Sequence, residues 1–148
     1  MIKRRFGLVA ALVGASILLS AQSGTAATAH LSGGGTASIS QVAMNVFFDG
    51  AGSASGSFNC LMAGRSKGVL GAFGLSHIMK VQATPTAGSV SGSTATFSGP
   101  GTLITDGQRM AIDVSVSVNV TTQQFQLTVI QVGAMPVETF SSGGVELR

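Results

Sequence analysis

The sequence predicts an all-β domain, either an antiparallel β-sandwich or a small β-barrel of about seven or eight strands, preceded by a cleaved signal peptide. Residues 112–120 alternate β-branched with polar side chains, which is the period of a strand with one buried and one exposed face. Asp-Gly turns separate other strand-like runs, and glycines within 66–79 argue against the one helix-like stretch. With no helix to cover a sheet, the strands must pack against one another.

The chain begins with the pattern of a secretory signal peptide. Basic residues at 3–5 precede an uncharged apolar run at 6–19, and small residues follow. This run is shorter than the roughly 20 residues that cross a bilayer as a helix. We therefore expect residues 1–29 to be removed during export, with cleavage within Ala26–Ala29. Residues 30–148 are expected to form a single secreted or periplasmic domain without a membrane span.

Removal of the leader changes the charge of the protein. Of the eight Lys and Arg residues, three lie in the leader, so five remain against five Asp and Glu residues. The expected mature net charge is therefore zero, apart from termini and histidines. Nucleic-acid binding requires a basic surface, so we expect no nucleic-acid partner. Because a neutral surface favours association, we predict a homo-oligomer or contact with another envelope or extracellular protein.

Strand-like runs follow one another along the rest of the chain. The expected strands cover residues 38–48, 53–62, 75–83, 93–98, 102–105, 109–120, 124–132 and 145–147. Asp49-Gly50 and Asp106-Gly107 are expected to turn the chain between neighbouring strands, and Thr121-Thr122 to join a hairpin. Gly33-Gly34-Gly35 and Gly99-Pro100-Gly101 lack the lysine and the following helix of a phosphate-binding loop, so we interpret both as strand ends and turns.

Few residues offer catalytic chemistry. Cys60 is an unpaired cysteine, which is either a reactive free thiol or a buried small hydrophobe, and its strand position favours burial. A hydrolase would need Cys60, His77 and Asp113 to converge, or Glu138 and Glu146 to act as paired carboxylates. No spacing in the sequence brings either set together. We expect no catalytic residues, no metal site and no cofactor.

The chain has two histidines, His30 and His77. His30 lies beside the expected new N-terminus, where we expect it to be mobile and solvated. His77 alternates with apolar residues, which favours a hydrogen-bonded strand position over a ligand role.

Phenylalanine and methionine supply the candidate contact residues. Phe47 and Phe48 are adjacent in a predicted strand, so one of them is expected to face outward as a contact. Met44, Met62, Met79 and Met110 could line a cavity for a small apolar ligand, although such residues are more often core. The chain has no Trp or Tyr, so it has no amphipathic ring to stack on a sugar, which weakens both a glycosidase and a lectin interpretation.

Several glycine-rich and β-branched stretches resemble a loose class of secreted bacterial β-domains, the post-COAP-like domains. The stretches are Gly33-Gly34-Gly35, Gly56-Ser57-Phe58, residues 94–101 and Ser142-Gly143-Gly144-Val145. The resemblance covers about residues 32–147 and implies an extracellular β-module without an assigned catalytic centre. Members often carry an acidic, glycine-rich stretch before the penultimate strand. Residues 118–124 contain no aspartate, which puts a cation site there in doubt.

Together these features predict an exported, non-catalytic β-domain that acts through its surface, as an envelope, matrix or adhesion component. The alternative is a small barrel that binds an apolar ligand. A hydrolase that uses Cys60 and His77, or Glu138, is the third hypothesis.

Overall fold

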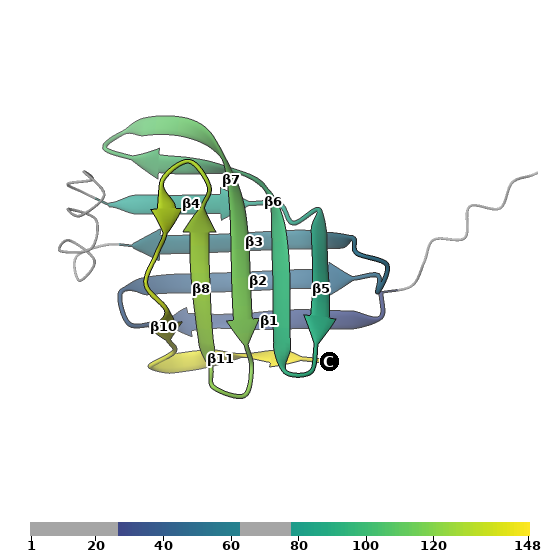
Figure 1. Cartoon of the computed structure of the whole chain (residues 1–148). Coiled ribbons are helices and arrows are strands. Elements are labelled where there is room, and N and C mark those ends of the chain that lie inside the picture. Colours follow the sequence, from purple (N-terminus) through teal and green to yellow (C-terminus); the bar gives the residue numbers. More distant parts are fainter. Residues whose placement is uncertain (1–26, 63–77) are drawn as a thin grey trace, which may run out of the picture.

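The computed structural model describes residues 27–62 and 78–148, which form β-strands and no helix (Figure 1). The strands are β1 (Ala29–Thr36), β2 (Ser40–Phe48), β3 (Ala54–Met62), β4 (Met79–Ala83), β5 (Ala87–Ser91), β6 (Thr94–Thr105), β7 (Gln108–Asn119), β8 (Gln124–Val129), β9 (Gly133–Ala134), β10 (Glu138–Thr139) and β11 (Ser142–Leu147). The predicted all-β class is confirmed. Within this part of the chain no helix is long and apolar enough to cross a membrane.

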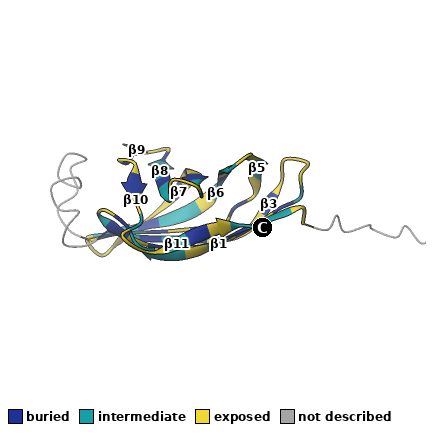
Figure 2. Cartoon of the chain, turned by 90° about the horizontal axis from the view of Figure 1, so that it is seen from below, coloured by how far each residue is buried: buried dark blue, intermediate teal, exposed yellow. Residues whose placement is uncertain are grey.

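All strands belong to one antiparallel sheet that curls into a half-barrel. The order is β10-β8-β7-β6-β4-β3-β2-β1-β11, with β5 added to β6 and β9 added to β8. Figure 1 shows β5 to β8 lying in front of β1 to β4 and β11, with the two sets of strands crossing. We call β5 to β10 the front layer and β11 with β1 to β4 the back layer. Figure 2 shows the buried residues concentrated between these layers.

β6 connects the two layers, and its course corrects one expectation. Residues 99–101 do not form a turn but lie inside this continuous strand, which pairs with β5 before them and with β4 from Gly101 onward. A Cβ added at Gly99 would lie 2.1 Å from the carbonyl oxygen of Thr84. The glycines therefore allow the close backbone approach that a strand needs where it changes partners and bends between layers.

β1 and β11 correct three further expectations. Gly33-Gly34-Gly35 is part of β1, and Gly143 and Gly144 are part of β11, which begins before Val145. His30 is part of β1, where its main chain exchanges hydrogen bonds with Arg148. A Cβ at Gly33 would lie 2.1 Å from the carbonyl oxygen of Gly144. Glycine occurs here because the two backbones approach closely, and not because the chain turns.

The hairpins follow their predicted turns. Asp106 and Gly107 have φ angles of 50° and 74° and join β6 to β7, as expected for a two-residue turn between antiparallel strands. At the β2–β3 turn, the Asp49 carboxylate accepts hydrogen bonds from the main-chain N–H groups of Ala51 and Ser53. These bonds lower the pKa of Asp49. β7 and β8 pair on either side of Thr121 and Thr122, as predicted.

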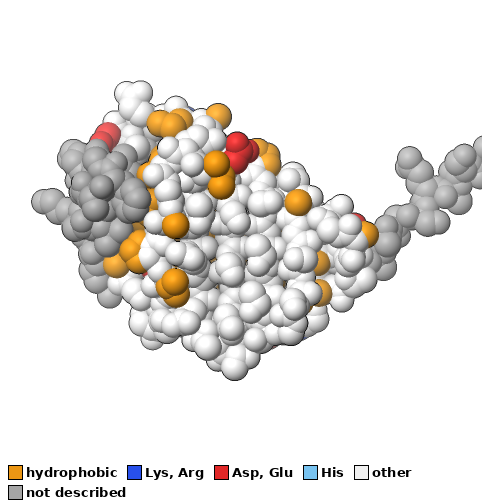
Figure 3. Space-filling view, in the orientation of Figure 1, with side chains coloured by type: hydrophobic (Ala, Val, Ile, Leu, Met, Phe, Trp, Pro, Cys, Tyr) orange, Lys and Arg blue, Asp and Glu red, His pale blue; other side chains and the backbone are white. Residues whose placement is uncertain are grey.

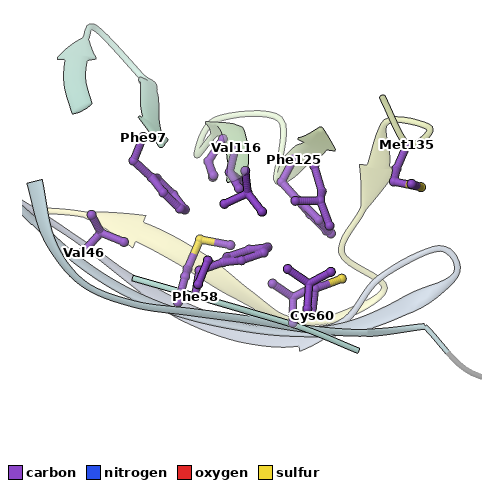
Figure 4. Packing of buried hydrophobic residues seen from close by; sticks show 14 of the residues in the cluster. Val46, Phe58, Cys60, Phe97, Val116, Phe125 and Met135 are labelled. Carbon is purple, nitrogen blue, oxygen red and sulfur yellow. The ribbon is translucent and has the colours of Figure 1, made fainter. Parts of the chain in front are cut away.

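The core consists of the inward-facing residues of both layers. The burial of β2 alternates along its whole length, and the predicted inward residues of β7 at 112, 114, 116 and 118 are buried. Figure 4 shows Phe97, Val116 and Phe125 of the front layer pointing toward Val46 and Phe58 of the back layer. The Phe58 and Phe97 rings meet edge to face, with centroids 5.7 Å apart.

The half-barrel is closed along one side by side chains. Gln123 accepts a hydrogen bond from the main-chain N–H of Val145 at 2.9 Å and donates one to the Val145 carbonyl at 2.8 Å. This amide therefore bonds the outer edge of β11 in the way that a neighbouring strand would. Ser141, just before β11, also donates its main-chain N–H to the Thr36 carbonyl. We call this region, where β11 and β10 meet β1 and β2, the seam.

Candidate functional site

A buried carboxylate lies at the seam between the two layers. Glu138, in β10, is 1% exposed. Its two carboxylate oxygens each lie 2.9 Å from the Ser40 hydroxyl, which donates to them, and Oε2 accepts the main-chain N–H of Ile39 at 2.9 Å. Ile39 and Ser40 lie 99 and 98 residues before Glu138 in the sequence, at the beginning of β2. The carboxylate therefore ties β10 to the beginning of β2. A buried carboxylate requires such donors.

Cys60 lies near Glu138 and Ser40, also on the inner face of the sheet. It is 1% exposed, and burial raises the pKa of its thiol to about 12, with hydrogen bonding to Ser40 lowering the pKa and the Glu138 charge raising it. The thiol is therefore protonated at neutral pH, whereas a nucleophilic cysteine needs a depressed pKa and access to substrate. The interpretation of Cys60 as a buried small hydrophobe is confirmed.

The side chains of the two hydrolase hypotheses lie in different environments. Asp113 is exposed, and its carboxylate accepts a hydrogen bond from Gln131. Cys60 instead faces the core. His77 lies outside the described residues. Glu146 is exposed and bonded to Arg148 at 2.7 Å, whereas Glu138 is buried with Ser40.

Sequence reasoning missed the link between Ser40 and Glu138. One signal was present for Ser40, because it shares the inward parity of Val42 and Met44 in an alternating strand. A polar residue at an inward position needs a buried partner. No local pattern identified Glu138 as that partner, because β10 has only two residues.

The methionine candidates divide between core and surface. Met62 and Met79 are fully buried and Met44 is 3% exposed, so these three side chains are part of the packed core. Met110 is 50% exposed.

Phe47 and Phe48 face opposite sides of β2, as the strand pattern predicts. Phe48 is buried and Phe47 is 39% exposed. The Phe47 ring stacks on the imidazole of His30, with centroids 4.2 Å apart and planes at 2°. His30 Nε2 lies 2.6 Å from Asn45 Oδ1, so the imidazole is held on the outer face of the back layer. This arrangement presents one ordered aromatic pair to solvent.

The outer face of the front layer presents aligned hydroxyl groups. Cross-strand register places Ser89, Thr96 and Ser117 in one row, and Ser98, Ser115 and Thr128 in the next. We call these six residues the hydroxyl face.

Strand geometry spaces neighbouring hydroxyls of one row by about 4.8 Å and the two rows by about 7 Å. Within the described part of the chain, none of the six hydroxyls has a hydrogen-bond partner. Figure 3, which views this side, shows a broad region with few charged or apolar side chains.

A groove of about 390 Å³ crosses the outer face of the back layer. It is lined by Gly35, Thr36, Gln41, Val42, Ala43, Asn59, Cys60, Leu61 and Lys80. The side chains of Val42 and Cys60 point into the core, so these two residues contribute main chain to the groove. Thr36, Gln41, Leu61 and Lys80 follow one cross-strand row from β1 to β4. We call this hollow the Lys80 groove.

The comparisons with known proteins find no match among family models, curated proteins or solved structures. Residues 27–62 and 78–148 also contain no group of three or more His, Cys, Asp or Glu side chains suited to a metal ion. The fold and the two outer faces therefore provide the basis for a functional assignment.

Proposed function

We propose that this protein is an exported, non-catalytic β-domain that acts through its outer surface, as an envelope, matrix or adhesion component. The hydroxyl face is the observation that carries this proposal. Its six hydroxyls are aligned across β5 to β8 and have no partner in the described part of the chain. Unpaired donors and acceptors on a sheet face with few charged side chains suit many weak contacts with a hydrated surface.

The buried thiol and carboxylate support the non-catalytic part of the proposal. A nucleophile or a general acid must come within hydrogen-bond distance of its substrate. Cys60 and Glu138 are each 1% exposed and lie under the seam. A hydrolase built on them would have to open its core, whereas the hydroxyl face is already accessible. The resemblance to post-COAP-like domains agrees with this assignment.

Export remains part of the proposal and depends on the leader-like sequence before residue 30. Thr28 donates its main-chain N–H to the Phe48 carbonyl, and Ala29 is the first residue of β1. Cleavage after Ala26 or Ala27 would keep both in the sheet, whereas cleavage after Ala29 would remove them. We therefore propose the earlier positions, which the mass of the exported protein would distinguish.

We propose that the protein also associates with itself through the outer face around Phe47. The ring is 39% exposed and already ordered by stacking on His30, so its burial would cost little conformational entropy. Sedimentation velocity is expected to show an oligomer that Phe47→Ser dissociates. A monomer at high concentration of the unsubstituted protein would contradict self-association.

The surface role is tested by fractionating the cells that export the protein. We expect it in the insoluble envelope or matrix fraction, and we expect Ser117→Lys in the hydroxyl face to shift it to the soluble fraction. Ser57→Lys is the matched control, because it places the same charge on an exposed serine of the other layer. Equal retention of both variants, or a soluble unsubstituted protein, would exclude the hydroxyl face as the contact.

A further inference from the structure

The Lys80 groove lies on the back layer, so it is separate from the hydroxyl face and does not depend on it. We propose that this groove binds an acidic polysaccharide, with a sugar carboxylate at Lys80 and sugar hydroxyls at Gln41, Asn59 and Thr36. The volume of about 390 Å³ lies within the range of ligand sites, which is roughly 300–1,000 Å³. The lining residues come from β1, β2, β3 and β4, so the polysaccharide would lie across these strands and not along them.

The charge of the groove favours an anionic ligand. Lys80 forms no ion pair within residues 27–62 and 78–148. Its cross-strand row continues through Ile104 to Arg109, so the row carries two cations. No acidic side chain occupies this row between Thr36 and Arg109. A carboxylate bound at Lys80 would therefore meet positive charge with no acidic side chain in the same row.

The polar groups of the groove suit sugar hydroxyls. Gln41 and Asn59 carry side-chain amides, which both donate and accept, and Thr36 adds a hydroxyl. Gln82 donates to Asn59 Oδ1 at 3.3 Å, which orients the Asn59 amide. Gly35, Ala43 and Leu61 provide a low, apolar floor against which the C–H face of a sugar ring can pack.

Backbone pairing argues against an acidic peptide in the same place. A peptide that extends a sheet needs a strand edge with unpaired N–H and C=O groups. β1, β2, β3 and β4 are each paired on both sides, so the groove has no such edge. The ligand must therefore be held by side chains, as a sugar is.

The described lining of the groove contains no aromatic residue. Ring stacking therefore adds no binding energy there, and a single exposed ion pair contributes about 0.2–1 kcal/mol. Each sugar unit is then bound weakly, and a polymer gains affinity by occupying several copies of the protein at once. Binding is expected to weaken at high salt, because exposed charges are screened.

The experiment is an NMR titration of the exported protein with a short oligogalacturonate at low ionic strength. A cello-oligosaccharide of the same length is the uncharged probe, and a short poly-glutamate is the peptide probe. We expect the side-chain amide resonances of Gln41 and Asn59 to shift with oligogalacturonate alone. Lys80→Gln is expected to lower that affinity by up to about fivefold, since it removes one exposed ion pair.

Arg148→Gln is the matched control, because it removes the same charge at the far end of β11. It should leave the titration unchanged, and Lys80→Arg should restore binding. No shift with oligogalacturonate would overturn the proposal, and so would equal binding of the neutral or peptide probe. Neither result affects the hydroxyl-face proposal, because Ser117 lies on the other layer.

Discussion

The β6–β7 hairpin and the seam are antiparallel pairings built by opposite means. In the hairpin, Asp106 and Gly107 turn the chain directly, and alternating valines and serines set the register. In the seam, β1 pairs with β11 from the other end of the chain, and glycines allow the two backbones to approach. Two side chains complete the seam, since Gln123 bonds the outer edge of β11 and Glu138 ties β10 to β2.

The two pairings differ in how many residues fix the register of their strands. The register of the hairpin is enforced many times over, because every inward valine would be exposed by a slip of one residue. The glycines of the seam provide no such pattern. The seam is therefore expected to be sensitive to single substitutions that the hairpins tolerate.

The largest effect is expected from a methyl group between β1 and β11. Gly33→Ala places a Cβ 2.1 Å from the Gly144 carbonyl oxygen at a φ of +141°. We expect a loss of about 3 kcal/mol or more in the free energy of unfolding, measured in urea. Gly92→Ala is the control, because it has a φ of +58° in the β5–β6 turn but nothing within 4 Å. It should cost about 1 kcal/mol, and equal costs would show that close approach is not the reason for Gly33.

The next effect is expected at the buried carboxylate. Glu138→Ala leaves the Ser40 hydroxyl and the Ile39 N–H without their acceptor, which is expected to cost about 2–3 kcal/mol. Glu138→Gln keeps one acceptor and should cost about 1 kcal/mol. Glu146→Ala, at an exposed ion pair, should change stability by less than about 1 kcal/mol. A Glu138→Ala cost as small as that of Glu146→Ala would mean that the carboxylate does not hold the seam.

A smaller effect is expected from the amide that covers the edge of β11. Gln123→Ala removes both hydrogen bonds to Val145 and is expected to cost about 1–2 kcal/mol. Hydrogen exchange at the Val145 amide should become faster, because its acceptor is gone. Gln82→Ala, which breaks an exposed 3.3 Å bond to Asn59, should leave that exchange rate unchanged.

The smallest effect is a pH dependence that arises from Cys60. The pKa of its thiol is about 12 in the folded protein against an ordinary value of 9.0, because burial disfavours the thiolate. Below pH 9 both states hold the proton, so the group has no effect. Above pH 9 the unfolded state loses the proton first, so stability falls as the pH rises from 9 to about 12.

Relative to Cys60→Ala, we expect the folded protein to lose about 1 kcal/mol between pH 9 and pH 10. The same burial predicts that iodoacetamide does not label native Cys60 at pH 8. Rapid labelling without unfolding, or parallel pH profiles for the two proteins, would contradict a buried thiol.

Part of the candidate site was predictable from local pattern. The opposite orientations of Phe47 and Phe48 follow from strand alternation, and the burial of Cys60 follows from its place beside Phe58 and Met62. The stack of His30 on Phe47 was not predictable, because β1 has a glycine-rich sequence that resembles a turn. The two rows of the hydroxyl face also require the register of four strands, which no single segment contains.

By itself, the amino-acid sequence determines that this chain is all-β and where its hairpins turn, because alternation and Asp-Gly turns act between near neighbours. The tertiary structure decided that the glycine runs are strands, that β6 crosses both layers and that Glu138 is buried with Ser40. These features depend on residues far apart in the chain. Their backbones and side chains meet only after the sheet has curled, so no local signal could report them.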